Sequence, residues 1–168
     1  MPDKVDSYRF LNGLTRRTVK SWIKRETPRQ IRWTPVNKPL CECAVSLVSS
    51  AGLGLRSGPP FDQQIERENP WYGDPSYRVI PQTARTADVK MYHLHVDPFF
   101  VEQDLNCLLP VEPLCDLEVE GVIGCAAEKH YSFMGYTVQP VILLEKSVPR
   151  MIDRLRDEQI DLVVLVPA

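Results

Sequence analysis

Apolar residues gather in short runs along the chain, and the spacing within each run predicts its secondary structure. Residues 43–49, CAVSLVS, are aliphatic and β-branched, which predicts a buried strand. Further strands are predicted at 76–81, SYRVIP, and at 89–96, VKMYHLHV, where apolar and polar positions alternate. The run YTVQPVILL, residues 136–144, also predicts a strand, interrupted by Pro140.

Two helices are predicted in the second half of the chain. LCDLEVEGVIG, residues 114–124, has apolar residues at helical spacing. The residues of its expected apolar face are Leu114, Leu117 and Val119. RMIDRLRDEQ, residues 150–159, shows the same spacing, and Ser147 is the expected N-cap ahead of it.

The last run of the chain, DLVVLVPA at 161–168, is almost continuously apolar. Such a run is typical of a strand covered by helices on both faces of a sheet. Strands and helices in this order predict an α/β fold, with a mostly parallel sheet flanked by helices. No helix follows the last strand in the sequence, so we expect its cover to come from another polypeptide or from a missing segment.

Residues 1–38 differ from the rest of the chain because basic and aromatic residues dominate them, as in RRTVKSWIKRETPRQIRW. A helix is predicted over 7–25, and the prolines that follow favour an extended segment. We therefore expect a basic N-terminal arm at 1–38 that contacts a partner. Residues 39–168 are expected to form the α/β domain, incomplete at its C-terminal end. An arm that grips RNA is less favoured, because no recognised nucleic-acid motif accompanies it.

Composition limits the class of protein further. The chain has 168 residues, of which 43% are apolar, and a net charge of −2. That charge gives no support for a nucleic-acid partner. No run reaches the roughly 18–20 consecutive apolar residues that span a bilayer, and the N-terminus lacks the order of a secretory signal. We therefore expect a cytoplasmic protein with no membrane partner.

Five cysteines are present, and no two of them form a C-x-x-C pair. They are Cys41, Cys43, Cys107, Cys115 and Cys125. An odd number at irregular spacing argues against a disulfide framework. We expect reduced thiols, most of them buried as small apolar side chains.

The first candidate for chemistry is HLHVD, which places His93, His95 and Asp97 at alternate positions. On a strand, these side chains share one face. Imidazole can ligate a metal or move a proton near neutral pH, and a carboxylate can orient it. Three interpretations stay open: a zinc or iron(II) site, a pocket for a polar substrate or subunit, and structural histidines. Asp104 and Asn106 follow closely and join the candidates.

The second candidate lies in GDPSYRVIP. Arg78 is expected on a strand beside apolar neighbours, where a partly buried guanidinium needs an anion. That anion is either a substrate carboxylate or an internal partner, Asp74 or Asp97. The sequence does not separate the two alternatives.

The third candidate is Ser132 in EKHYSFMGY, a motif that suggests a polar turn. A serine two residues from His130 is not a catalytic dyad by itself, because the base must reach the hydroxyl and an oxyanion site must exist. The alternative is that the motif's aromatic residues pack and that Ser132 caps a turn.

The sequence resembles the selenoprotein B family of glycine, sarcosine, betaine and D-proline reductases in four motifs, with similar order and spacing. The motifs are LVSSAGLGL, GDPSYRVIP, HLHVDPFFVEQDLNCLLPVEPLCDLEVEGVIG and HYSFMGY. The resemblance extends from about residue 40 to the C-terminus and leaves out the basic arm.

The resemblance implies a subunit or fragment of a reductase complex that cleaves a C–N bond in an amino-acid-like substrate. It also implies a pyruvoyl group on a partner subunit and a redox selenocysteine or cysteine. In the family that redox residue follows a strand matching DLVVLVP, where this sequence stops at Ala168. None of the five cysteines matches it, so we expect the redox centre beyond Ala168 or on a partner. A UGA codon read as stop and a natural split are the two hypotheses.

Under this resemblance the polar residues form a wall opposite the redox atom. The catalytic candidates are His93, His95 and Asp97, and the substrate-binding candidates are Arg78, Asp74, Asp104, Asn106 and Ser132. One histidine is expected to protonate the leaving amine, and Arg78 to hold a carboxylate. The chain is therefore expected to be an oxidoreductase component that works in a heteromer and is not competent alone.

Two functions of other classes compete with this one. The first is a metal-dependent hydrolase or lyase that uses His93, His95 and Asp97, and metal analysis of wild-type and His95→Ala protein tests it. The second is a non-catalytic complex subunit whose basic arm docks a partner, and deletion of residues 1–38 tests it.

Overall fold

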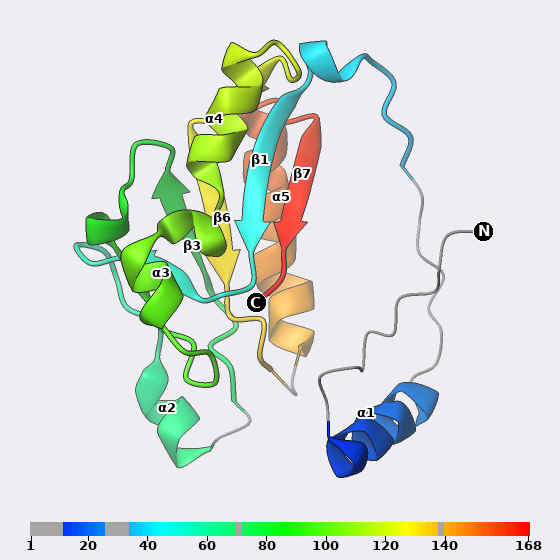
Figure 1. Cartoon of the computed structure of the whole chain (residues 1–168), viewed down its shortest axis with the longest axis vertical. Coiled ribbons are helices and arrows are strands. Elements are labelled where there is room, and N and C mark those ends of the chain that lie inside the picture. The colour runs from blue at the N-terminus through cyan, green and yellow to red at the C-terminus, as the bar shows by residue number, and fades with distance from the viewer. Residues whose placement is uncertain (1–11, 26–33, 70–71, 138–139) are drawn as a thin grey trace. The chain divides into compact units, whose positions relative to one another are not determined.

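The computed structural model describes residues 12–25, 34–69, 72–137 and 140–168 (Figure 1). The chain forms two compact units, Met1–Pro35 and Val36–Ala168. In the first unit, helix α1 spans Gly13–Arg25, and none of its residues is buried. The predicted helix is therefore confirmed over that range, and its part at 7–11 lies outside the described residues. No helix in the described part of the chain is long and apolar enough to cross a membrane.

The second unit is built on a five-stranded sheet in the order β3–β6–β1–β7, with the short β5 beside the start of β1 (Figure 1). The strands are β1 (Ala44–Ser49), β3 (Tyr77–Pro81), β5 (Cys125–Ala126), β6 (Lys129–Phe133) and β7 (Leu162–Val166). Strand β1 pairs in parallel with β5, β6 and β7, and β3 pairs antiparallel with β6. The predicted α/β class with a mostly parallel sheet is confirmed.

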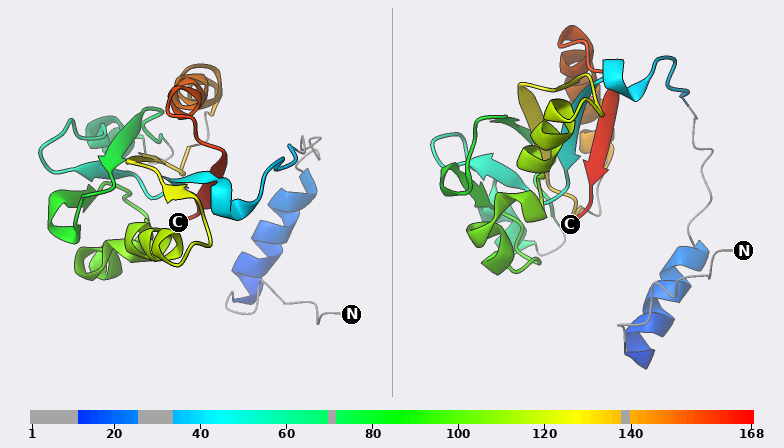
Figure 2. Two further views of the ribbon diagram at one scale, coloured as in Figure 1. Left: turned by 90° about the horizontal axis from the view of Figure 1, so that it is seen from above. Right: turned by 45° about the horizontal axis from the view of Figure 1, so that its top comes forward.

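Helices cover the two faces of this sheet (Figure 2). The α-helices of the unit are α2 (Gln63–Glu68), α3 (Phe99–Gln103), α4 (Val111–Val119) and α5 (Val148–Asp157), and a π-helical stretch at Leu143–Ser147 leads into α5. Short 3₁₀ turns lie at Leu40–Glu42, Thr86–Asp88 and Leu105–Cys107. Alternate residues of β1 serve the two layers, because successive strand residues face opposite sides. Val45 and Leu47 belong to the core of α3 and α4, whereas Val48 packs with Met151 of α5.

A separate antiparallel pair joins β2 (Leu53–Leu55) to β4 (Val89–Met91). The predicted strand at 89–96 therefore stops early, and the extended conformation expected at His93, His95 and Asp97 is wrong.

The length of β2 explains why β4 ends. Leu53 pairs with Met91, and the Gly52 carbonyl accepts the last hydrogen bond from the Tyr92 N–H at 2.9 Å. No strand of the described chain lies alongside the residues that follow. Because strand backbone groups need partners, the chain turns at Leu94 and His95 instead.

The described residues of 136–144 do not form the predicted strand. The strand in this part of the chain is β6, which lies earlier in the sequence at Lys129–Phe133. The chain is helical from Val141 onward. Pro140 accounts for the difference, because proline suits the start of a helix and its carbonyl accepts a hydrogen bond from the Leu144 N–H at 2.8 Å. Ser147 lies inside this continuous helical stretch and its side chain makes no capping hydrogen bond, so its predicted N-cap role is wrong.

The predicted helix at 114–124 corresponds to α4, which begins earlier and ends at Val119. Of its expected apolar face only Leu114 is buried, whereas Leu117 and Val119 are 38% and 88% exposed. Val119 is five residues from Leu114, which at about 100° per residue places it well around the helix from the sheet.

Strand β7 is confirmed as a strand, and cover from another polypeptide or from a missing segment stays a prediction. It lies at the edge of the sheet and pairs with β1 (Figure 1). Val163, Val164 and Leu165 are 38%, 45% and 72% exposed. Apolar composition therefore identified the strand without identifying what covers it.

Candidate functional site

The carboxyl ends of the parallel strands meet at one edge of the sheet, which we call the carboxyl edge. There the Ser50 N–H donates to the Val166 carbonyl at 3.0 Å, and the Ser50 carbonyl accepts from the Gly135 N–H at 2.8 Å. The Ser50 Oγ accepts from the Ala168 N–H at 2.9 Å. The segments after β1, β6 and β7 are thus joined through one residue. Ligands of open α/β sheets bind at this edge, which makes it the first candidate site.

The loop after β4 is held against the same edge by Gly52. This residue has a φ of +61°, and its carbonyl binds the Tyr92 N–H. A Cβ on Gly52 would lie 2.8 Å from Met134 Cε and 3.5 Å from the His93 N. Only glycine permits this backbone conformation and close approach together. The LVSSAGLGL motif therefore brings His93 beside the ends of β1 and β6.

His93, His95 and Tyr136 form a group of three rings, which we call the imidazole–tyrosine cluster. The ring centroids of His95 and Tyr136 are 4.1 Å apart, and His93 lies 6.0 Å from each of the other two rings. His93 is partly buried and His95 is exposed. The structure thus brings the two predicted histidines together and adds Tyr136. The sequence analysis missed this tyrosine, whose signal was its place in HYSFMGY.

The protonation of His93 follows from its surroundings. Its Nδ1 accepts a hydrogen bond from the His95 N–H at 3.2 Å, so the neutral ring carries its proton on Nε2. Burial lowers the pKa of His93 below its ordinary value, and the neighbouring His95 lowers it further. The neutral ring is therefore the main form at pH 7, with Nε2–H as a donor.

Asp97 makes a local backbone contact, and a catalytic role for it stays a prediction. Its Oδ1 accepts a hydrogen bond from the Phe99 N–H at 3.0 Å, which stabilises the start of α3. Among the described residues, no group of three His, Cys, Asp or Glu side chains is arranged to hold a metal ion. A metal centre built on His93, His95 and Asp97 therefore lacks its ligand set in this part of the chain.

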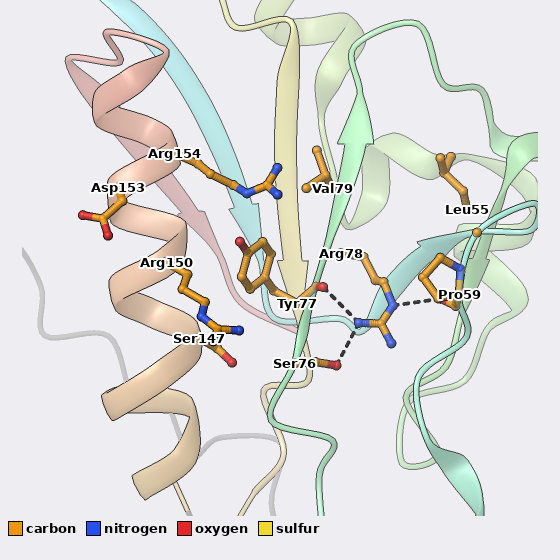
Figure 3. A pocket seen from close by; sticks show the side chains of 11 residues that line it. Leu55, Pro59, Ser76, Tyr77, Arg78, Val79, Ser147, Arg150, Asp153 and Arg154 are labelled. Atoms are coloured by element: carbon orange, nitrogen blue, oxygen red, sulfur yellow. Dashed lines mark hydrogen bonds between the residues drawn. The ribbon is translucent and has the colours of Figure 1, made fainter.

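Arg78, on β3, is held by acceptors of the loop after β2 and of the residues just before it (Figure 3). Its Nε and Nη2 donate to the carbonyls of Pro59 and Pro60 at 2.8 and 2.6 Å, and its Nη1 donates to the Tyr77 carbonyl and the Ser76 Oγ at 2.9 and 2.8 Å. The guanidinium carbon also lies 4.0 Å from the ring centroid of Phe61. Four of its five N–H groups are therefore committed within the protein.

The internal anion beside Arg78 is Asp74. Its Oδ2 lies 3.7 Å from Arg78 Nη2 and accepts from the Asp62 N–H at 2.7 Å, and its Oδ1 accepts from the Ser76 N–H at 2.8 Å. Burial lowers the pKa of Arg78, and the Asp74 charge opposes that shift. The pair therefore holds the loop that follows β2. Substrate binding by Arg78 and Asp74 stays a prediction.

Ser132 and His130 are fully buried on β6 and join strands. The Ser132 Oγ donates to the Ser49 carbonyl at 3.0 Å and accepts from the Leu53 N–H at 2.9 Å. The His130 Nδ1 accepts from the Leu47 N–H at 3.2 Å, between the stretches of β1 that pair with β5 and β6. Burial lowers the pKa of His130 to about 4, against the opposing charge of Glu158. The geometry supports a structural role for both residues.

Asp104 and Asn106 form a third group near the start of α4. The Asp104 Oδ1 accepts from the Asn106 N–H and Nδ2 at 2.9 Å each, and the Asn106 Nδ2 donates to Glu112 at 3.0 Å. The Asn106 Oδ1 accepts from the Glu112 N–H at 3.1 Å. These contacts tie the turn after α3 to α4, and a substrate contact by either residue stays a prediction.

Cys43 and Cys125 do not supply a thiol at the carboxyl edge. Cys43 directly precedes β1 and Cys125 begins β5, so both lie at the opposite edge of the sheet. All five cysteines are free, as expected, but only Cys43 is buried, so the expectation of mostly buried thiols is wrong. The redox residue that the resemblance implies follows a strand matching β7, and none of the five cysteines stands after β7 in the given sequence.

Known proteins with similar sequences indicate the family of this chain. Residues 19–168 match the profile of the family described as glycine/sarcosine/betaine reductase selenoprotein B. The chain is 33% identical over 133 residues to the D-proline reductase subunit gamma of Acetoanaerobium sticklandii, which covers 79% of this chain and 52% of that protein. It is 28% identical over 102 residues to the glycine reductase complex component B subunit gamma of Carboxydothermus hydrogenoformans, covering 60% of this chain and 22% of that protein.

The chain thus spans about half the length of the first relative, and less of the second. No solved structure matches it.

Proposed function

Since the chain belongs to the glycine/sarcosine/betaine reductase selenoprotein B family, we propose that it is a subunit of a complex that reductively cleaves a C–N bond in a small amino-acid-like substrate. The two relatives support this, because their names describe subunits of a D-proline reductase and of a glycine reductase complex. The family match over 19–168 carries the proposal, and it includes the whole carboxyl edge.

The imidazole–tyrosine cluster is the proposed site of proton transfer. Reductive cleavage breaks the C–N bond with an electron pair and two protons, one for the carbon and one for the leaving nitrogen. His93 is a suitable donor in its imidazolium form, because burial lowers its pKa and so makes the protonated ring a stronger acid. Because none of the described cysteines follows β7, we place the source of the electron pair outside the described residues.

Turnover of the intact complex tests this assignment. The complex is isolated through a tag on this chain, and release of amine or ring-opened product from glycine, sarcosine, betaine and D-proline is measured with a dithiol reductant. His93→Gln and His95→Gln are expected to lower turnover of the preferred substrate about 100-fold, the scale of general acid catalysis. Arg156→Gln, an exposed change on α5, serves as the control and should leave turnover unaltered.

Two results would contradict different parts of the assignment. Normal turnover in both histidine variants would remove the cluster from the mechanism while leaving the complex a reductase. Absence of turnover with all four substrates, in a complex that is fully assembled, would contradict the reductase assignment itself.

We further propose that another subunit of the complex adds a strand to the open edge of β7. The residues Leu162–Val166 carry no charge, and β7 pairs on one side only in the described chain. Exposed apolar edge strands associate readily unless they are covered. The names of both relatives describe subunits, which favours a partner subunit over a second copy of this chain.

Leu165→Lys tests this contact. Leu165 is 72% exposed, so the change should leave the fold of the free chain intact while it prevents co-purification of the partner. Val119→Lys, at an 88% exposed position of α4, is the matched control and should retain the partner. An intact complex in Leu165→Lys would exclude the β7 edge. The N-terminal arm remains a predicted partner contact, tested by deletion of residues 1–38.

A further inference from the structure

A cavity of about 710 Å³ lies between α5, β3 and the loop after β2, and Arg78, a predicted substrate-binding residue, is part of its lining (Figure 3). Its lining includes Leu55, Pro59, Tyr77, Val79, Arg150 and Arg154. The volume is in the range of sites that hold small molecules. None of the three rings of the imidazole–tyrosine cluster lines it.

Arg150 and Arg154 give the α5 wall of this cavity a positive charge. They are four residues apart, so they lie on the same face of the helix. Figure 3 shows Arg154 reaching from α5 toward Val79, and Arg150 lying nearer to Ser147. Among the described residues, neither guanidinium forms an ion pair with a carboxylate.

The lining also includes an acidic residue, Asp153, whose ion pair in the described chain is with Arg156 and not with either of these arginines. In Figure 3 the Asp153 carboxylate lies on the side of α5 away from Tyr77, and its Oδ1 is 3.8 Å from Nη1 of Arg156. Like charges at this helical spacing repel each other. An anion between Arg150 and Arg154 would therefore both bind and relieve that repulsion.

Apolar side chains form part of the lining beside the arginines. Tyr77 and Val79 pack on the cluster formed by Tyr131 and α5, with the two tyrosine ring centroids 6.0 Å apart. Leu55 and Pro59 line the other side of the cavity. A ligand that fits this lining has an apolar body as well as a charged group.

We propose that this cavity binds a small organic anion, whose carboxylate or phosphate group is held by Arg150 and Arg154 and whose apolar body rests on Tyr77 and Val79. The planar guanidinium suits both kinds of oxyanion, because it presents parallel N–H donors. The site lies apart from the carboxyl-edge cluster, and it does not depend on the reductase assignment.

NMR titration of the ¹⁵N-labelled full chain tests the proposal. The probes are benzoate and phenyl phosphate, with acetate and inorganic phosphate as the same anions without an aromatic body. At least one aromatic anion should give saturable shifts of the Arg150 and Arg154 Nε–H signals, with a dissociation constant of about 1 mM. The aromatic anion with the lower dissociation constant identifies the preferred oxyanion, carboxylate or phosphate. Acetate or inorganic phosphate, which carries the same oxyanion without the ring, should bind more weakly than that aromatic anion.

Three variants locate the binding. Arg150→Gln and Arg154→Gln should each weaken it about fivefold to tenfold, as expected for loss of a charge-assisted contact. Arg156→Gln removes the same charge from the same helix outside the cavity lining, and it should change the constant less than about twofold. Circular dichroism verifies that each variant is folded. Absence of saturation by both aromatic anions, or an equal loss in all three variants, would overturn the proposal.

Discussion

The three histidines of the chain divide between two regions with opposite physical character. His130 is fully buried in β6, where its Nδ1 accepts a backbone hydrogen bond from β1. His93 and His95 lie at the turn beside the carboxyl edge, where His93 is partly buried and His95 is exposed. The same type of side chain therefore accepts a hydrogen bond between strands in one region and belongs to the proposed site in the other. The residue type is the same in both regions, and the surrounding backbone groups and burial make the difference between the two roles.

Replacing His130 should have the largest effect on stability. His130→Ala leaves the buried Leu47 N–H without its acceptor and opens a cavity, so the free energy of unfolding should fall by about 3 kcal/mol. His130→Asn keeps an acceptor near the position of Nδ1 and should cost about 1 kcal/mol. Urea unfolding measures both changes. Equal losses in the two variants would show that the hydrogen bond contributes nothing.

The acid sensitivity of the fold should come next. The folded pKa of His130 is about 4, below its ordinary value of 6.5, so the unfolded chain binds more protons between these values. Its stabilising contribution is complete above pH 6.5 and is lost as the pH falls toward 4. The loss is about 3 kcal/mol in all, and His130→Asn should lack this part of the pH dependence. Parallel curves for wild type and variant, from urea unfolding at each pH, would contradict the prediction.

The carboxyl-edge histidines should contribute far less to stability. His95→Ala removes an exposed ring, but the backbone N–H of residue 95 still donates to the His93 Nδ1. The free energy of unfolding should therefore fall by less than about 0.5 kcal/mol. Thermal unfolding of the free chain measures the difference. A loss as large as that of His130→Ala would mean that the imidazole–tyrosine cluster is a structural core rather than an accessible site.

The smallest expected effect is a shift in one titration midpoint. In a proton NMR titration His130 should stay neutral until the pH approaches 4, and His93 should titrate below its ordinary value of 6.5. Because the His95 charge lowers the pKa of His93, His95→Ala should raise the His93 midpoint. A midpoint that does not move would assign the shift to burial alone.

The local sequence pattern predicted strands correctly where a neighbouring strand pairs with them along their length. It failed where the pairing strand was shorter than the pattern. Residues 43–49 are apolar and became β1, which has strands on both sides. VKMYHLHV shows a strand pattern as well, yet it is extended only to Met91, because β2 offers three residues to pair with. HYSF reads as a polar turn by itself, but it is a central strand, since its serine and histidine bind backbone groups of β1 and β2.

The candidate site shows the same division. The adjacent histidines could be selected from the sequence, since imidazoles two residues apart are a local feature. Tyr136 could not, because its ring reaches His95 only after β6 and the loop beyond β4 meet at Gly52. Ser132 and Asp74 looked equally suited to substrate, but backbone donors brought from distant segments occupy their oxygens.

From the amino-acid order alone came the α/β class, the apolar strands and the family, since these depend on periodicity and motifs within short stretches. Tertiary structure alone decided which polar groups are spent inside the fold, which histidines remain accessible, and that β7 is left open. The physical reason is that a hydrogen bond or a buried surface needs two parties, and in this protein the second party is often 80 or more residues away, as for His130 and Leu47.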